Sequence, residues 1–285
     1  MRGFLKSILP GKFNETIGVQ HTKICIFDDD VCISGANLSS DYFSQRQDRY
    51  ILIKDAPKLA KYFEDLVDSI SSFSFDLNTT VVDNKIEPSY TLNKSCNGTH
   101  PFEGSYDHYV ANAHKRVSSF IGEQKEANSL KFQKENEVFV ECSEIKQKVP
   151  EDNVTNDSDT WVFPSVQMGV FRIHQDELLT SKFLSNTGNE SSSRIVFGTG
   201  YFNLTDEYMT SIMHKSKAQF DIICAHPKAN SFFNAPFPLY GVPFAYSYIA
   251  RHFLNLCKQV GASDRINIFE YQRPSWTFHG KGNFT

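Results

Sequence analysis

Residues 21–37 read HTKICIFDDDVCISGAN, and this stretch decides the expected local fold. Two short β-prone runs, 23–27 and 31–34, flank three consecutive aspartates, a pattern that predicts a tight hairpin. His21 and Lys23 are two residues apart, so on an extended strand their side chains point to the same face, roughly 6.5–7 Å from one another. An imidazole placed in this way can attack a phosphorus atom while the ammonium group neutralises the phosphoryl oxygens.

The same His-x-Lys spacing recurs near the other end of the chain, at His279 and Lys281. Two such pairs favour a single site that both ends of the chain build together around one electrophile. The recurrence is also consistent with a pseudo-duplicated architecture, although no repeat of fixed period accompanies it.

The composition excludes some classes of function. The chain has 285 residues, enough for one large domain or two ordinary domains with a real hydrophobic core. It carries 29 basic and 33 acidic residues, a net charge of −4, so no global cationic surface indicates a nucleic-acid partner. Phosphate binding therefore has to depend on local groups. The six cysteines show neither CxxC nor zinc spacing, and we expect reduced thiols.

The pattern of apolar residues changes along the chain. Residues 76–104 are rich in Asn, Thr, Ser, Gly and Pro and show no regular period, and 150–159 is the best linker candidate. From Trp161 onward strands and helices alternate, which predicts an α/β fold with a largely parallel sheet. The expected helices are 57–70, 106–120, 174–184, 205–217 and 244–260, and the expected strands of the second half are 194–199, 220–225 and 266–271, with another near Trp276.

The first His-x-Lys pair is followed by an Asp and a Gly at fixed spacings. The pattern His-x-Lys-x4-Asp-x6-Gly, read here from His21 through Asp28 to Gly35, resembles the signature of the phospholipase D superfamily. A His-x-Lys tripeptide alone arises by chance in many proteins, so the Asp and the Gly at fixed offsets carry the resemblance. One position departs from the pattern: the superfamily commonly has Gly-Ser-x-Asn, whereas Asn37 comes one residue early, after Gly35-Ala36.

Five stretches narrow the resemblance further. They read FNETIG, SGANLS, RQDRY, GYFNLT and WTFH, at residues 13–18, 34–39, 46–50, 200–205 and 276–279. Together they resemble the eukaryotic phosphatidylglycerophosphate synthase family over most of the chain. The resemblance implies a phospholipase D-like, two-lobed α/β/α sandwich with mixed, largely parallel sheets and an incomplete first lobe.

The same resemblance implies a division of the chain into three parts. Residues 1–75 are expected to form the C-terminal part of the first lobe, with the first motif. Residues 76–160 are expected to connect the lobes and to contain one helix. Residues 161–285 are expected to form the second lobe, which ends within the second motif.

The activity implied by the family is transfer of a phosphatidyl group from CDP-diacylglycerol to glycerol-3-phosphate. The products are phosphatidylglycerophosphate and CMP, in the biosynthesis of phosphatidylglycerol and cardiolipin. The resemblance also implies a phosphohistidine intermediate and no metal or other cofactor, because Lys23 and Lys281 hold the phosphoryl oxygens instead. The family is mitochondrial, on the matrix side of the inner membrane, although residues 1–6 give no clear transit peptide.

The expected catalytic residues are His21, Lys23, Asp28, His279 and Lys281. The sequence leaves open which histidine is the nucleophile. CMP leaves with little proton help, because the second pKa of a phosphate group is about 6, whereas the glycerol hydroxyl needs a base. We therefore expect the other histidine to act as the general base of the second half-reaction. Asp28, at the end of the hairpin, is expected to set backbone and charge.

The expected substrate-binding residues are Asn37, Arg46, Asp48 and Arg49. Asp48 or Asp41 is a candidate for orienting an imidazole, and pairing with one of the neighbouring arginines is the alternative. The two arginines are candidates for binding glycerol-3-phosphate, and a solvated or ion-paired surface role is the alternative for them.

Several alternatives remain open at this point. By the family pattern Met1 lies inside the first lobe and the sequence stops soon after Lys281, so a catalytically impaired form that binds lipid or a partner is one alternative. Phosphatidylserine synthase and cardiolipin synthase share the two-histidine chemistry and are alternatives within the class. Residues 231–240, SFFNAPFPLY, form either a packed loop or a loop that enters a membrane to reach a lipid substrate, and a peripheral membrane surface is an expected partner.

Overall fold

The computed structural model describes residues 19–82, 85–96, 99–135, 162–187 and 193–284. Contacts divide the chain into two compact units. Unit 1 comprises residues 1–18 and 61–175, and unit 2 comprises residues 19–60 and 176–285. The lobe boundaries expected at residues 75 and 160 stay a prediction, and the expected linker at 150–159 lies outside the described residues.

The predicted hairpin is present in unit 2. Strands β1 (Ile24–Phe27) and β2 (Asp30–Ser34) pair antiparallel, and β4 (Tyr50–Ile53) pairs antiparallel with β2. Asp28 lies in the tight turn with a positive φ of 53°, a conformation that Asp tolerates better than most residues. Val31 is fully buried and lies on the same face of the sheet as Ile26 and Ile53, its partners in the ladder.

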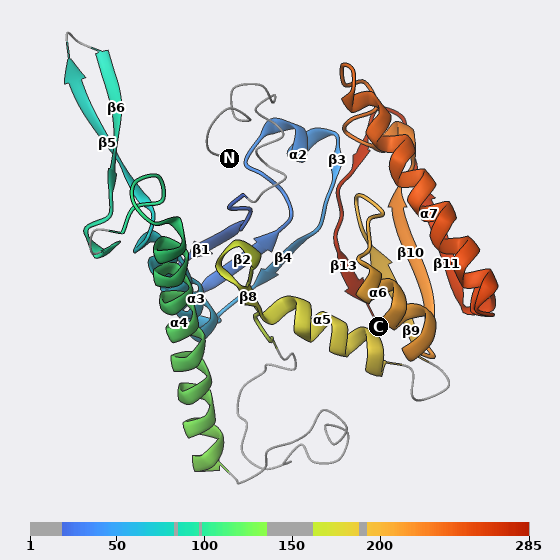
Figure 1. Cartoon of the computed structure of the whole chain (residues 1–285), viewed down its shortest axis with the longest axis horizontal. Helices are drawn as coiled ribbons and strands as arrows, with labels where there is room; N and C mark the ends of the chain where they lie inside the picture. The colour runs from blue at the N-terminus through green and yellow to red at the C-terminus, as the bar shows by residue number, and fades with distance from the viewer. Residues whose placement is uncertain (1–18, 83–84, 97–98, 136–161, 188–192, 285) are drawn as a thin grey trace. The chain divides into compact units, whose positions relative to one another are not determined.

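The main sheet of unit 2 has the order β11-β10-β9-β13. Strands β9 (Arg194–Gly198), β10 (Gln219–Ala225) and β11 (Ile266–Tyr271) are parallel, and β13 (Gly282–Phe284) joins β9 antiparallel (Figure 1). The three expected strands of the second half are therefore confirmed, as is the mixed α/β fold class. The sheet around the hairpin is antiparallel, so the parallel character belongs to the main sheet.

Helices α5 (Gln175–Asn186) and α7 (Val242–Gln259) confirm two of the expected helices. The helix expected over 205–217 is shorter: α6 (Asp206–Thr210) is followed by a π-helical turn, η4 (Ser211–Lys215). Arg265 explains why this irregular turn persists, because its guanidinium donates to the carbonyl oxygens of Ile212 and Met213, each at 2.8 Å. Backbone acceptors that a regular helix would satisfy internally are thus satisfied by a side chain.

The hydrophobic core of unit 2 joins the main sheet to these helices. Its fully buried side chains are Leu184, Ile195, Phe202, Ile212, Phe220, Ile222, Phe253 and Cys257. Phe220 and Ile222 alternate with Asp221, which is buried beside them but belongs to the other face of β10. Arg194 and Asn267 pair with Asp221, and these hydrogen bonds lower the pKa of the Asp221 carboxyl.

Two short strands pair segments that are far apart in the sequence. Strand β3 (Arg46–Gln47), which follows α2 (Ser40–Ser44), pairs parallel with β12 (Thr277–Phe278). The backbone N–H of Thr277 donates to the carbonyl of Gln45 at 3.0 Å, and the N–H of His279 donates to that of Gln47 at 2.8 Å. This pairing sets the position of the second His-x-Lys motif.

Unit 1 corrects one sequence expectation. Residues 76–104 were expected to be irregular, but β5 (Phe75–Val82) and β6 (Lys85–Leu92) form an antiparallel hairpin. Its alternation places Leu77 and Val81 on one face, directly opposite Tyr90 and Ile86. The polar residues and Pro88 concealed this two-residue period, and the exposed apolar face supplied no continuous apolar run.

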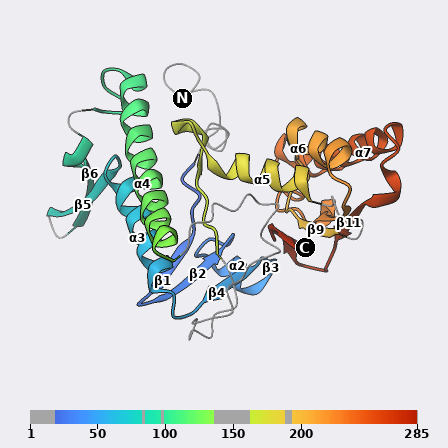
Figure 2. The same cartoon turned by 90° about the horizontal axis from the view of Figure 1, so that it is seen from below.

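The other elements of unit 1 include helices α3 (Pro57–Ser71) and α4 (Tyr106–Glu135), which lie side by side in both views (Figures 1 and 2). Their contact includes the rings of Tyr62 and Phe120, whose centroids are 5.1 Å apart. The remaining short elements are η2 (Lys94–Cys96), β7 (Gln167–Met168), η3 (Gly169–Phe171) and β8 (Ile173–His174) in unit 1, and η5 (Pro227–Ala229), η6 (Leu239–Gly241) and η7 (Ser263–Arg265) in unit 2. In the described part of the chain, none of the helices combines the length and apolar character needed to cross a membrane.

Candidate active site

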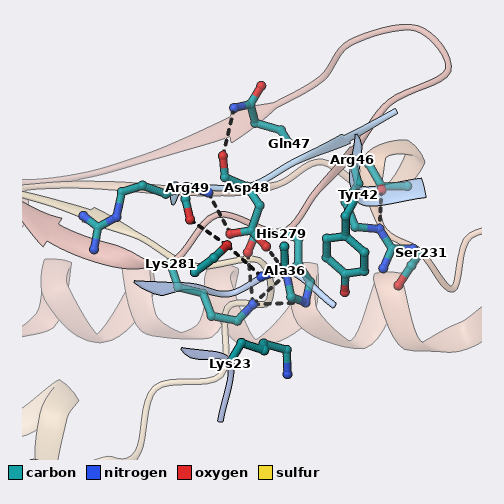
Figure 3. Close-up of polar contacts among 12 residues, drawn as sticks. Lys23, Ala36, Tyr42, Arg46, Gln47, Asp48, Arg49, Ser231, His279 and Lys281 are labelled. Carbon is teal, nitrogen blue, oxygen red and sulfur yellow. Dashed lines mark hydrogen bonds and ion pairs between the residues drawn. The ribbon is translucent and has the colours of Figure 1, made fainter. Parts of the chain in front are cut away.

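A buried carboxylate and an imidazole form the centre of the site, in unit 2. Asp48 follows β3 and His279 follows β12, so the pairing of these strands places the two side chains next to each other. The Asp48 Oδ2 atom lies 2.7 Å from His279 Nδ1 (Figure 3). The Asp48 side chain is 1% exposed and that of His279 is 13% exposed, so the contact is almost entirely shielded from water.

Burial decides the protonation of His279. It lowers the pKa of the imidazole below its ordinary value, and the hydrogen bond to Asp48 opposes this change only in part. The ring is therefore neutral at physiological pH. With the Nδ1 proton directed at the carboxylate, Nε2 carries the lone pair that can accept a proton or attack an electrophile.

Two lysine side chains meet at this centre. Lys281 Nζ lies 3.0 Å from each ring nitrogen of His279 and donates to its carbonyl oxygen at 3.0 Å. Lys23 Nζ donates in the same way to the carbonyl of His21, at 2.8 Å, so the two His-x-Lys pairs repeat one local geometry. Figure 3 draws Lys23 beside Lys281.

The lysines share one counter-charge. Burial lowers the pKa of Lys281 to about 8, Asp48 opposes this change, and the nearby positive charges of Lys23 and Arg46 add to it. Burial also lowers the pKa of Lys23, again opposed by Asp48. Three cationic side chains thus surround one buried carboxylate, an excess of positive charge that suits a phosphate-containing ligand.

Two glycines leave room for these side chains. A Cβ atom on Gly35 would lie 2.9 Å from Asp48 Oδ1, and a Cβ on Gly282 would lie 2.5 Å from the guanidinium of Arg49. Gly282 also has a φ of +151°. The glycine of the first motif thus has a steric reason here, because any side chain at residue 35 would displace the carboxylate that holds His279.

The segment from Ser34 to Arg49 holds the carboxylate from the other side. The backbone N–H of Arg49 donates to Asp48 Oδ1 at 2.8 Å. Ser34 Oγ donates to the Arg49 carbonyl at 2.9 Å and accepts the N–H of Ala36 at 3.0 Å. Both carboxylate oxygens are therefore engaged, which fixes the direction in which Asp48 presents its charge.

Tyr42 is a site residue that the sequence reasoning missed. Its ring packs edge-on against His279, with centroids 5.2 Å apart, and the Arg46 guanidinium lies 4.4 Å above the Tyr42 ring. Arg46 Nε also donates to Thr277 Oγ1 at 3.2 Å. Tyr42 lies in a five-residue helix without a chemical motif, so no sequence signal marks it.

The structure brings together some of the expected site residues and not others. Lys23, Arg46, Asp48, His279 and Lys281 converge, and Arg49 adjoins them through its backbone. His21 contributes its carbonyl to Lys23. Asp28 lies at the turn, on the order of 15 Å along the strand from Lys23. Asn37 is exposed, and its backbone carbonyl accepts the N–H of Ser39 at 2.9 Å.

Metal ligands do not cluster in the described part of the chain. No group of three or more His, Cys, Asp or Glu side chains there is arranged to hold a metal ion. The expected metal-independent chemistry stays a prediction.

Comparison with known proteins identifies what this chain is similar to. It is 36% identical over 288 residues to the mitochondrial CDP-diacylglycerol–glycerol-3-phosphate 3-phosphatidyltransferase of Gallus gallus, and 34% identical over 297 residues to that of Homo sapiens. Each match covers 99% of this chain. The chain is a homologue of these phosphatidyltransferases. The resemblance expected from the motifs is therefore confirmed, and the chain spans about half the length of these relatives, 49% and 48%.

A solved structure supports the fold. The crystal structure of phosphatidylserine synthase from Haemophilus influenzae superposes with a TM-score of 0.53, covering 95% of this chain and 52% of that chain. The sequence identity is 19%, so the similarity concerns the fold, and it confirms the expected phospholipase D-like α/β class. No family model matches the chain.

The buried contact between Asp48 and His279 leads to a prediction about the pKa of the His279 imidazole. Replacing Asp48 with Asn is expected to lower the pKa of His279 further, because the carboxylate is the group that raises it. The pKa is measured by NMR titration of the histidine ring protons. Asp41→Asn, an exposed change in α2, is the matched control and should leave the value unchanged. A His279 pKa that stays constant or rises in Asp48→Asn would contradict the described contact.

Proposed function

We propose that this chain carries out phosphatidyl transfer from CDP-diacylglycerol to glycerol-3-phosphate, giving phosphatidylglycerophosphate and CMP. The observation that carries the proposal is the convergence of Lys23, Lys281 and Arg46 on the Asp48–His279 pair. The proposal also rests on homology, since the relatives named above bear that activity in their names. The reaction exchanges a phosphoanhydride bond for a phosphate ester, which requires a nucleophile, a base and cations rather than a redox group.

The first half-reaction is assigned to His21. A nitrogen of its imidazole attacks the phosphatidyl phosphorus, a P–N bond forms, and the P–O bond to CMP breaks. The surroundings of the other histidine, His279, favour this assignment. His279 is neutral, held by a buried carboxylate and shielded from water, which suits a proton acceptor.

The second half-reaction is assigned to His279. The glycerol hydroxyl oxygen attacks phosphorus, the P–N bond to His21 breaks, and the hydroxyl proton passes to His279 Nε2. The imidazolium that forms is stabilised by Asp48 through the 2.7 Å contact at Nδ1. Asp48 acts through His279, so it is a positioning residue, and Asp28 sets the turn that ends the strand of the first motif.

The cations stabilise charge on the phosphoryl oxygens. Lys23 and Lys281 take the role that a metal ion plays in other phosphoryl transfers. Arg46, stacked on Tyr42, is assigned to the phosphate of glycerol-3-phosphate, with Arg49 and Asn37 as further substrate-binding residues. The proposed location is mitochondrial, as the names of the relatives state for those proteins, on the matrix side of the inner membrane.

The proposal extends to contact with a lipid surface through residues 231–240. The first half of this segment packs: Tyr201 Oη lies 2.7 Å from Ser231 Oγ, and the Phe232 ring lies 6.1 Å from that of Tyr201. The second half is open, with Phe237 83% and Tyr240 49% exposed. Gly200, next to Tyr201, lies against the backbone of His279, so the segment 231–240 contacts a second loop that adjoins the site.

The transfer reaction is tested with radiolabelled CDP-diacylglycerol and glycerol-3-phosphate. We expect CMP release that depends on the acceptor. In His279→Ala the phosphatidyl-enzyme should still form, whereas transfer to glycerol-3-phosphate should fall by roughly 10²–10⁴-fold. His252→Ala, an exposed histidine on α7, is the control. Loss of intermediate formation in His279→Ala would reverse the assignment of the two histidines, and absence of CMP release from a folded chain would favour a binding module.

The low pKa of Lys281 predicts the alkaline limit of the activity. As pH rises through about 8 the ammonium group loses its proton, so the initial rate of CMP release should fall. In Lys281→Arg this decline should move to higher pH, because guanidinium keeps its proton to about pH 12. Lys228→Arg, at an exposed lysine of the same unit, should keep the wild-type profile. An unchanged alkaline limb in Lys281→Arg would assign the limit to another group.

Vesicle sedimentation tests the lipid contact. Phe237→Ser should weaken binding to vesicles that contain anionic phospholipid by about tenfold, since the aromatic side chain no longer enters the apolar region. Phe269→Ser, at a phenylalanine that is 52% exposed on β11, is the matched control and should bind as the wild type does. Equal binding by Phe237→Ser and the wild type would show that this loop does not hold the membrane.

A further inference from the structure

Two cysteines face each other directly across the hairpin of the first motif. The register of β1 and β2 pairs Cys25 with Cys32. Both are free thiols, and both are partly exposed. Because residues directly opposite in an antiparallel pair project to the same face, the two sulfur atoms lie on one side of the hairpin.

The distances in such a pair are compatible with a disulfide. Directly opposite residues have Cα atoms roughly 4.5 or 5.5 Å apart, and both values fall within the range of about 4.4–6.8 Å that disulfides span. The Cβ atoms, roughly 4.5–5.5 Å apart in a ladder, must approach to about 3.8 Å when the bond closes. Formation of the bond therefore draws the two strands together locally.

The other described cysteines contrast with this pair. Cys96, Cys224 and Cys257 are buried, and burial raises the pKa of each thiol, to about 11 for Cys224. A buried thiol that stays protonated is a poor nucleophile. Cys25, in contrast, is partly exposed and lies two residues from the cation of Lys23, on the same face of the strand.

We propose that Cys25 and Cys32 are a redox modification site that closes to a disulfide under a hydroperoxide. One thiolate attacks the peroxide oxygen, which breaks the O–O bond, releases the other oxygen as water or an alcohol, and leaves a sulfenic acid. The second thiol then attacks that sulfur, the S–S bond forms, and water leaves. Two thiols are oxidised by two electrons in total, the peroxide is reduced, and a dithiol reductant reverses the change.

The modification acts on the phosphate-holding cation. Lys23 precedes Cys25 by two residues on the same face, and Ser34 follows Cys32 by two residues on the neighbouring strand. Ser34 holds the Arg49 carbonyl, and the Arg49 N–H holds Asp48. Contraction at the cysteine pair therefore displaces Lys23 and loosens the carboxylate that it faces. This consequence rests on the proposed function, whereas formation of the disulfide does not.

Peptide mapping tests the site itself. The full chain is treated with hydrogen peroxide under native conditions, remaining thiols are alkylated, and peptides are analysed without reduction. We expect a disulfide that joins Cys25 to Cys32. Cys96, Cys224 and Cys257 should remain reduced thiols that the reagent alkylates once the chain is unfolded. A preference for any other pairing, including one through Cys142, or oxidation without a disulfide, would overturn the proposal.

Binding of inorganic phosphate, measured by calorimetry, tests the consequence. The oxidised wild type should bind phosphate roughly tenfold more weakly than the reduced wild type, the loss expected for one misplaced charged contact. Cys25→Ser and Cys32→Ser, each treated in the same way, should keep the affinity of the reduced protein. Equal affinity of the reduced and disulfide-bonded wild type would overturn control of the site, whereas no binding by the reduced protein would contradict the proposed phosphate site instead.

Discussion

The parallel pairing of β3 with β12 is the contact on which the site depends. It aligns Asp48 with His279 across 231 residues of sequence, and it does so with two backbone hydrogen bonds, from Thr277 and from His279 itself. Each such bond contributes only about 1 kcal/mol net to stability. The backbone pairing is therefore supplemented by side chains: Asp48 contacts His279, the Tyr42 ring packs against the His279 ring, and Arg46 donates to Thr277.

The site carries more positive than negative charge. Lys23, Lys281 and Arg46 share a single buried carboxylate, and burial already favours loss of a proton from Lys281. In the proposed function a ligand with phosphate oxygens completes this balance, because it returns negative charge to cations that the protein has removed from water. Burial, together with the charges of Lys281 and Arg46, also lowers the pKa of His279, so in the proposed function phosphate binding and basicity come from one cluster of side chains.

Homology and geometry describe the same part of the molecule. The chain matches about half the length of the phosphatidyltransferases to which it is homologous, and both His-x-Lys motifs lie within the matched half. The two motifs also share a local geometry, since each lysine donates to the carbonyl of its own histidine. A backbone contact of this kind orients the ammonium group without using a second carboxylate.

The sequence by itself determined the local features of this protein. The hairpin after His21, the parallel strands of the second half and helix α7 each follow from a period or a turn within a short window, where neighbouring residues decide the conformation. Two local features were not predicted from the sequence. Polar residues obscured the alternation of the β5–β6 hairpin, and Tyr42 belongs to no motif that would mark it as a site residue. Only the tertiary structure decided which acidic residue meets the imidazole. Asp41 and Asp48 were equal candidates in the sequence, and the pairing of β3 with β12 selects Asp48 because it sets two distant backbones in register.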